Sequence, residues 1–255
     1  MKIRVLGCSG GQIPGYRLSS FLIDDSLLVD AGSATAALSL AAQRKIRHVL
    51  VTHTHLDHVG TLGPLADNLF GNRTQVTVWS DREIVRGLRR YFFNDQIWPD
   101  FTRITARAQR IPVLRLRPLP RGRATAVGRH RVTGVPVNHV VPSVALFIER
   151  DSRTLLHVGD TGPTERVWSA AARCPTLRAV VVETSFPNRL QEIADASRHL
   201  TPRTLAAELK KLGERAVPIL ITHLKPEYRR EIIGELRAMK DPRVRILKDG
   251  DVIAL

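Results

Sequence analysis

Residues 51–60, VTHTHLDHVG, place three histidines and one aspartate within six positions, directly after an apolar run. Imidazole and carboxylate groups together suit Zn²⁺, Mn²⁺ or Fe²⁺. Four such groups in an ordinary core would leave polar atoms without partners, which is costly. A bound metal would satisfy them, so the stretch predicts a metal-binding turn.

The spacing of the histidines indicates which backbone carries them. His53 and His55 stand at i and i+2 and therefore share one face of an extended segment, whereas a helical zinc site needs histidines at i and i+4. Asp57 and His58 follow too closely to join the same ion easily, so we expect them to bind a second ion roughly 3.5–4 Å from the first. The alternative is a surface loop that is merely rich in histidine.

Length and composition predict a single domain spanning residues 1–255. The 43% hydrophobic content is ample for a core, and no run of about 18 or more apolar residues suggests a membrane span. Residues 1–6 lead directly into a strand pattern rather than a signal peptide, so we expect a cytoplasmic protein without membrane contact. Cys8 and Cys174 lack the spacing of a disulfide framework or a zinc finger.

The formal net charge is +15, and most of the 39 basic residues are arginine. Residues 101–148 contain no acidic residue and form the best candidate for a positive surface, so RNA is a candidate partner. A coding bias toward arginine explains the pattern equally well. The arginines of this block are Arg103, Arg107, Arg110, Arg115, Arg117, Arg121, Arg123, Arg129 and Arg131.

Strand and helix patterns alternate along most of the chain, which predicts an α/β fold. The order is best explained by a four-layer αββα sandwich, in which two mixed β-sheets pack face to face and are flanked by helices. A second sheet is expected to begin near residue 113. The expected strands are 3–6, 20–23, 27–29, 48–51, 76–79, 124–127, 131–137, 144–148, 153–158, 179–182 and 218–222, and the expected helices are 34–43, 59–69, 81–93, 190–197, 202–212 and 226–239.

Residues 92–101 interrupt this alternation with aromatic and polar side chains and a proline. The segment is either a substrate lid or a hydrophobic plug that fixes a loop to the core, because aromatic clusters usually pack internally. In the first interpretation Asn94, Trp98 and Phe101 are candidate substrate-binding residues.

Three further candidate ligands follow apolar strands in the second half of the chain. His139 follows residues 132–137, Asp160 follows 155–158, and His223 follows 219–221. Active-site residues of α/β proteins commonly stand at such strand ends. These residues supply the additional ligands that two metals require.

With Asp30 and the His53–His58 turn, these residues resemble, in order, the metal motifs of the metallo-β-lactamase fold superfamily, across nearly the whole chain. The resemblance implies two divalent ions, with Zn²⁺ expected and Mn²⁺ or Fe²⁺ as alternatives. It implies that Asp30 braces the histidine loop. The implied ligands are His53, His55 and His139 for one metal, Asp57, His58 and His223 for the other, and Asp160 between them.

Within that superfamily the chain is similar to the class II cyclic-nucleotide phosphodiesterases of bacteria and fungi. The similarity lies in HLDH at 55–58, GDTG at 159–162, ETSF at 183–186, HLTP at 199–202 and THLKP at 222–226. His199 lies outside the ligand set and is the candidate general acid, because histidine titrates near neutral pH. The alternative is a surface histidine beside Thr201, which would cap the helix that begins at Pro202.

The resemblance implies hydrolysis of 3′,5′-cyclic nucleotides such as cAMP and cGMP to nucleoside 5′-monophosphates by a metal-bridging hydroxide. Asp57 and Asp160 are expected to orient the metals and the hydroxide. His199 is expected to stabilise the phosphoryl oxygens or to protonate the departing 3′-oxygen.

Other functions fit part of the same pattern. An RNA-processing nuclease resembling the tRNA 3′-end endonucleases is favoured by the basic block, although no long inserted arm for gripping tRNA is evident. A thioester, lactone or sulfate-ester hydrolase of the same fold is a second alternative. A non-catalytic nucleic-acid-binding module is a third, and the complete ligand set argues against it. Proteins of this fold often dimerise, so a homodimer is also open.

Overall fold

Two seven-stranded β-sheets form the centre of the computed structural model, which describes residues 1–70, 75–105, 111–213 and 215–255. The first sheet has the spatial order β14 (Val252–Ala254), β1 (Lys2–Gly7), β2 (Ser20–Ile23), β3 (Leu27–Val29), β4 (His48–Leu50), β5 (Val76–Ser80) and β6 (Leu114–Pro118). The second has the order β13 (Val244–Ile246), β12 (Ile219–Thr222), β11 (Leu177–Glu183), β10 (Arg153–His157), β9 (Val144–Arg150), β8 (His130–Pro136) and β7 (Thr125–Val127).

Both sheets are mixed. In the first, β1, β2 and β3 form an antiparallel meander, and β3 to β6 then pair in parallel. In the second, β8, β9 and β10 are antiparallel, while β10 to β13 pair in parallel. Strands β8, β10, β11 and β12 therefore run in one direction, and their carboxyl ends meet at one edge of the sheet.

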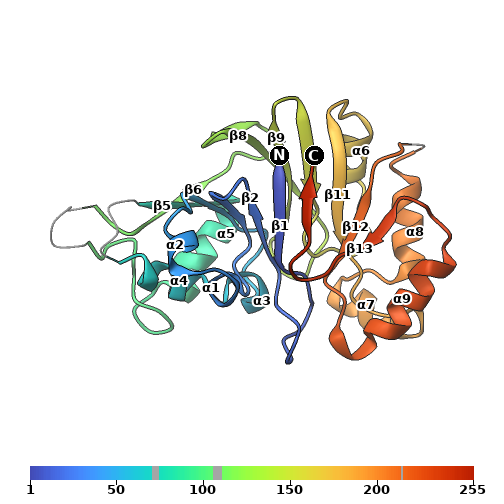
Figure 1. Ribbon diagram of the computed structural model, residues 1–255, viewed down its shortest axis with the longest axis horizontal. Helices are drawn as coiled ribbons and strands as arrows, with labels where there is room; N and C mark the ends of the chain where they lie inside the picture. The colour runs from blue at the N-terminus through green and yellow to red at the C-terminus, as the bar shows by residue number, and fades with distance from the viewer. Residues whose placement is uncertain (71–74, 106–110, 214) are drawn as a thin grey trace.

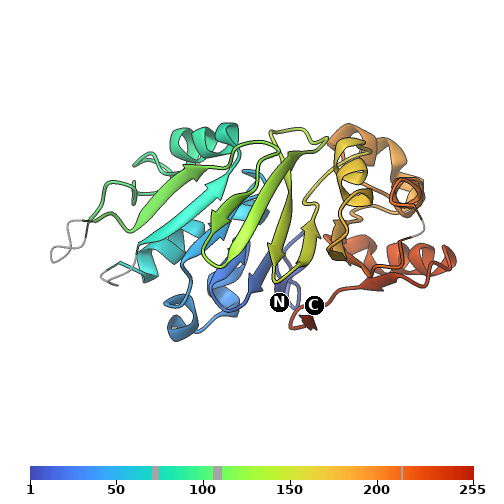
Figure 2. The ribbon, with the colours of Figure 1, turned by 90° about the horizontal axis from the view of Figure 1, so that it is seen from above.

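Helices cover the outer face of each sheet, as Figures 1 and 2 show. The prediction of a four-layer sandwich is therefore confirmed. Beside the first sheet lie α1 (Ala34–Ala37), α2 (Leu40–Gln43), α3 (Leu56–Val59), α4 (Leu62–Asn68), α5 (Arg82–Gly87) and the π-helical turn η1 (Leu88–Phe92). Beside the second lie α6 (Arg166–Ala172), η2 (Asn188–Leu190), α7 (Gln191–Ser197), α8 (Pro202–Lys210), η3 (Pro226–Tyr228) and α9 (Arg229–Ala238).

The core has two parts. Side chains of both sheets share the first cluster, which includes Val49 and Leu50 of β4 together with Leu146 of β9. The second cluster lies between the second sheet and its helices and is centred on Trp168, whose indole N–H donates to the Glu208 carboxylate at 2.7 Å. Strands covered on both faces, such as β3 and β12, are nearly continuous apolar runs. Among the described residues, no helix has the length and apolar character needed to cross a membrane.

Several boundaries differ from the sequence prediction. The helix expected at 34–43 is broken, because Leu38 is extended and the Ser39 hydroxyl caps α2 by accepting from the Ala42 N–H. The expected helix 59–69 is shorter, because α4 covers only Leu62–Asn68 and Val59 is the last residue of the separate helix α3. The second sheet does not begin near residue 113, because β6 pairs with β5 in the first sheet. Helix α6 and the strands β13 and β14 were not predicted.

Candidate dinuclear metal centre

The histidine turn lies at the carboxyl end of β4, as its sequence predicts. His53 follows the end of the strand by three residues, and α3 begins directly after His55. His53 and His55 therefore lie on the segment between the strand and the helix, where His55 is extended, while Asp57 and His58 lie on the short helix. His139, Asp160 and His223 each follow the carboxyl end of a strand of the second sheet, namely β8, β10 and β12.

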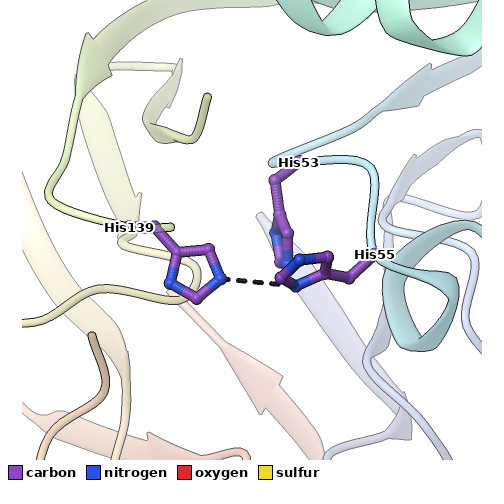
Figure 3. Close-up of side chains that lie close together, drawn as sticks. All are labelled: His53, His55 and His139. Atoms are coloured by element: carbon purple, nitrogen blue, oxygen red, sulfur yellow. Dashed lines mark hydrogen bonds between the residues drawn. The ribbon is translucent and has the colours of Figure 1, made fainter. Parts of the chain in front are cut away.

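The first potential ligand set consists of His53, His55 and His139, whose ligand atoms lie within 4.8 Å of one another. Figure 3 shows the three rings converging, with Nε2 of His139 at 3.4 Å from Nδ1 of His55. A carbonyl oxygen can only accept, so Nδ1 of His139 donates to the Arg198 carbonyl at 3.1 Å. Nε2 of His139 is then unprotonated, and its lone pair is free to bind a metal. Three converging imidazole rings of this kind commonly hold divalent ions such as Zn²⁺.

His53 gives an independent indication that a ligand belongs here. The Thr52 hydroxyl donates to Asp30 at 2.8 Å, so its oxygen accepts from Nδ1 of His53 at 3.1 Å. Nε2 of His53 therefore carries a lone pair, and it is fully buried with no hydrogen-bond partner among the described residues. A buried polar atom without a partner is unfavourable, and a metal ion would supply that partner.

The second potential set consists of Asp57, His58, Asp160 and His223, again within 4.8 Å of one another. Oδ2 of Asp160 lies 3.3 Å from Nε2 of His58 and 3.2 Å from Nε2 of His223. The same oxygen lies 3.7 Å from Nε2 of His53, so Asp160 stands between the two sets. A carboxylate at this position suits a bridge between two ions.

Close backbone packing fixes His223. Its φ is 64°, a left-handed backbone conformation that residues other than glycine rarely adopt. Its N–H donates to the Cys8 carbonyl at 2.7 Å, and Gly10 lies so close that a Cβ there would be 2.6 Å from the imidazole Nδ1. The glycine-rich loop after β1 therefore makes room for the ligand histidine.

Asp30 braces the histidine turn, as the family resemblance implies. It directly follows β3 and is fully buried, and it accepts from the Thr52 N–H at 2.8 Å and from Nδ1 of His58 at 2.7 Å. Burial alone would raise the pKa of Asp30, but contacts with His58 and His157 outweigh it and hold that pKa well below its usual range. Asp30 therefore fixes the tautomer of His58, whose Nε2 faces Asp160.

His199 lies beside both ligand sets and is held by Glu183. Its ligand atom is within 4.8 Å of those of His139 and Asp160, and its Nδ1 lies 2.6 Å from Oε1 of Glu183. Burial alone would lower the pKa of His199, but the Glu183 carboxylate outweighs burial and raises it. His199 is only 8% exposed, so it is not a surface histidine, although Thr201 does cap α8 as the sequence indicates.

Glu183 is the residue whose importance the sequence least revealed. It ends β11, is fully buried, and accepts from the Ser185 hydroxyl at 2.7 Å and the Thr161 N–H at 3.2 Å, as well as from His199. Because Ser185 donates to Glu183, its oxygen accepts from Nδ1 of His223 at 3.0 Å. One carboxylate thus orients His199 directly and His223 through a hydroxyl. Two sequence signals pointed to Glu183: it is a carboxylate at the end of an apolar strand, and it is the first residue of the ETSF motif at 183–186.

The candidate substrate-binding residues of the 92–101 segment make internal contacts. Phe101 is 4% exposed in the core, and the Trp98 ring packs on α4, where a Cβ at Gly63 would lie 2.6 Å from it. Asn94 accepts from the Gln96 and Ile97 N–H groups. These contacts favour the hydrophobic plug over the lid, and a contact of Asn94, Trp98 or Phe101 with substrate stays a prediction.

The arginine block of residues 101–148 is partly neutralised by nearby acids. Arg121 is hydrogen-bonded to Asp81 at 2.5 and 3.0 Å, and Arg103 forms ion pairs with Asp95 and Asp100. Arg107 and Arg110 lie outside the described residues. Binding of RNA by this block stays a prediction.

The comparison with protein families agrees with this geometry. Residues 25–223 match the family model described as a beta-lactamase superfamily domain. A protein of Yersinia pestis named a probable 3′,5′-cyclic-nucleotide phosphodiesterase is 28% identical, over 98% of this chain and 88% of its own. A ribonuclease Z of Archaeoglobus fulgidus is 23% identical, over 90% of this chain and 89% of its own.

Solved structures share the fold. The crystal structure of unliganded yeast PDE1 superposes with a TM-score of 0.82 at 21% identity, covering 100% of this chain and 99% of that one. The fold implies divalent metal ions, and the orphaned Nε2 of His53 and the two converging ligand sets fit them. The chain therefore belongs to the metallo-β-lactamase superfamily and is a metal-dependent hydrolase.

Proposed function

We propose that this hydrolase cleaves the phosphodiester of 3′,5′-cyclic nucleotides and releases nucleoside 5′-monophosphates. The observation that carries the proposal is the buried His199–Glu183 pair, 2.6 Å apart, beside two sets of metal-ligating side chains. A phosphodiester needs charge neutralisation at phosphorus and a proton for its leaving oxygen, and this arrangement supplies both. The name of the Yersinia pestis relative supports the choice of a cyclic nucleotide.

The two ligand sets would hold two divalent ions, which supply a nucleophile at neutral pH and neutralise charge on the phosphoryl group. Asp160, between the sets, and Asp57, at 3.1 Å from Nε2 of His223, would provide the negative charge that keeps both ions in place. Nδ1 of His199 is occupied by Glu183, so Nε2 is the nitrogen that can act on substrate. It would transfer its proton to the departing 3′-oxygen, which leaves as a hydroxyl group.

A hydrolysis panel tests this function directly. The protein is loaded with Zn²⁺ or Mn²⁺ and offered 3′,5′-cyclic nucleotides, 2′,3′-cyclic nucleotides, a simple aryl phosphodiester and a tRNA precursor. We expect the highest kcat/KM with a 3′,5′-cyclic nucleotide and the 5′-monophosphate as product. Cleavage of the tRNA precursor without cleavage of any 3′,5′-cyclic nucleotide would overturn the proposal.

The role of His199 is tested by His199→Ala. Loss of a general acid lowers kcat by roughly 10²–10⁴-fold, and we expect the metal content to be retained. The matched control is His48→Ala, because His48 opens β4 at the strand end opposite to the ligands. Loss of metal from the His199 variant would make His199 a ligand instead.

Processing of RNA is the second candidate. It is favoured by the similarity to a ribonuclease Z over most of both chains and by the net charge of +15. A phosphate-contacting protein loses affinity steeply with salt, so the test is binding of the tRNA precursor between low and moderate ionic strength. A steep salt dependence together with specific 3′-end cleavage would place this function first.

A further inference from the structure

A cavity of about 310 Å³ adjoins the ligand turn, and none of its lining residues has been given a role so far. Its walls come from two directions. Ile84 and Tyr91 belong to α5 and η1, whereas Val141 and Pro142 belong to the loop after β8. Thr54 of the ligand turn also lines the cavity. Most of the lining surface is apolar, and its charged residues, Glu83, Arg86 and Arg90, are exposed.

The cavity is connected to the metal centre through the chain itself. Thr54 separates the candidate ligands His53 and His55, and residues 141–142 follow His139 by two and three positions. Thr54 and the wall formed by Val141 and Pro142 are therefore neighbours in sequence of the three-histidine set, whereas the wall formed by α5 and η1 is not. The cavity therefore adjoins the backbone of two segments that carry ligands of this set.

An unusual backbone turn presents Tyr91 at the edge of the cavity. The Phe93 N–H donates to the Leu88 carbonyl at 2.8 Å, which is the i to i+5 bond of a π-helical turn. Such turns are rare and occur often at functional sites. Leu88 and Phe92 are buried by the turn, whereas Tyr91 remains 65% exposed. Gly87 holds the helix close to the ligand turn, because a Cβ there would lie 3.3 Å from the Thr54 methyl group.

We propose that this cavity binds the nucleobase of the substrate, with the Tyr91 ring as its stacking surface. The inference rests on the proposed phosphodiesterase function and extends it. Apolar side chains such as Ile84 and Pro142 suit the faces of a planar base. The Arg90 guanidinium lies 5.3 Å from the Tyr91 ring centroid, and aromatic rings and arginine planes are the groups on which bases stack. The positive charges of Arg86 and Arg90 exceed the negative charge of Glu83, which is paired with Arg121 at 3.4 Å, and this balance suits an anionic nucleotide.

The test is equilibrium binding to the full-length, zinc-loaded protein, measured by calorimetry. The two probes are a nucleoside 5′-monophosphate and ribose 5-phosphate, which lacks the base. We expect the nucleotide to bind about 5- to 150-fold more tightly, the range that one stacked base provides. Tyr91→Ala should remove most of this preference, and Tyr91→Phe should retain it because the ring remains.

The control variant is Phe70→Ala, which removes another exposed aromatic side chain, 52% exposed, at the end of α4. It should bind both probes as the wild type does. A base preference that survives Tyr91→Ala, or that is absent from the wild type, would overturn the inference.

Hydrolysis assays on the same preparations separate this inference from the proposed function. If the base preference depends on Tyr91 but no 3′,5′-cyclic nucleotide is cleaved, the cavity inference stands and the proposed function fails. If cyclic nucleotides are cleaved with the same KM by the wild type and Tyr91→Ala, the function stands and the cavity inference fails.

Discussion

The two halves of the metal centre are built in different ways. The first half is local, because four ligand candidates lie within residues 53–58 and one buried carboxylate, Asp30, braces them. The second half is dispersed, because His139, Asp160 and His223 come singly from the ends of β8, β10 and β12. In the first half one carboxylate braces the turn, whereas in the second half the ligands have separate supports: Nδ1 of His139 donates to the Arg198 carbonyl, and Nδ1 of His223 donates to the Ser185 hydroxyl.

The two halves therefore depend to different degrees on the complete fold. The turn at 53–58 takes its arrangement from one strand end and one helical turn. The dispersed ligands meet only when β8, β10 and β12 are aligned in one sheet and that sheet packs on the first. Substitutions in the two halves should therefore have distinguishable effects on catalysis, metal affinity and stability.

The largest expected effect is that of Asp160→Ala. Asp160 is 2% exposed and is the carboxylate between the two sets, so its loss leaves clustered imidazoles without their counter-charge. The contribution of two correctly held ions is several kcal/mol, so we expect kcat/KM to fall by roughly 10⁴-fold or more. Hydrolysis assays together with metal analysis of the purified variant measure this.

The matched control is Asp67→Ala, which removes an exposed carboxylate on α4. It should retain both activity and metal. If Asp160→Ala folds, as judged by circular dichroism, and still turns over substrate at a wild-type rate, then the dispersed half is not part of the catalytic centre.

Glu183→Gln should have the next largest effect. The substitution keeps the shape but removes the charge that holds Nδ1 of His199, so we expect kcat to fall by roughly 10²-fold while metal content is retained. Glu183 is a positioning residue, and because the amide oxygen of glutamine can still accept from Ser185, the effect of Glu183→Gln is expected to act through His199. The measurement is therefore a double-mutant cycle, in which Glu183→Gln should have little further effect once His199 is alanine. Equal effects in both backgrounds would assign Glu183 a purely structural role.

The comparison of the two halves also explains what the sequence could predict. Each ligand candidate follows an apolar strand, and this local signal identified all seven residues that the structure brings together in the two sets. The pairing of one strand with another depends on residues far away in the sequence. The alternation around Leu116 is the same in either sheet, so the sequence could not show that β6 pairs with β5 rather than opening the second sheet.

Two other misses have different causes. The break between α1 and α2 depends on the hydroxyl of Ser39 as a cap, a signal that was present within an Ala/Leu-rich run and was overlooked. The role of Glu183 could not be read from its neighbours, because His199, its partner, lies 16 residues away and is brought close by β11 and α7. Helix α6 offered an apolar pattern around Trp168 that was also overlooked.

Asp30→Asn tests the side-chain brace of the local half. Asparagine tolerates the left-handed backbone at this position, where φ is 56°, but it weakens the hydrogen bond to Nδ1 of His58. We expect metal affinity to fall about 10- to 100-fold, measured by competition with a chelator. The matched control is Asp151→Asn, the same substitution at another left-handed position, with φ of 50°, in the exposed turn between β9 and β10. A control that lost as much affinity would show that the loss does not come from the brace at His58.

The smallest expected effect on catalysis is that of Asp24→Asn, which weakens a polar link between the two sheets. Asp24 follows β2 and accepts from Arg150 of β9 at 2.7 Å and from the Lys2 N–H at 2.8 Å. Burial alone would raise the pKa of Asp24, but these hydrogen bonds outweigh it and lower the pKa. The variant should lose about 1–2 kcal/mol of unfolding free energy at pH 7 while its kcat stays near that of the wild type.

The dependence on pH identifies the charge of Asp24 as the cause. A carboxylate with a lowered pKa in the folded state contributes stability above its unfolded pKa, near 4, and loses it as the pH falls through the folded pKa. The difference between wild type and variant should therefore be full at pH 7 and shrink below about pH 4. Asp25→Asn is the control, because Asp25 lies in the same turn and also has a positive φ, of 59°. Its carboxylate forms an exposed ion pair with Arg4 at 3.6 Å, within the first sheet. If both variants lost the same unfolding free energy, the hydrogen bond between Asp24 and Arg150 would not stabilise the packing of the two sheets. The sheet that carries the local half would then be held to the sheet that carries the dispersed half by the packed core.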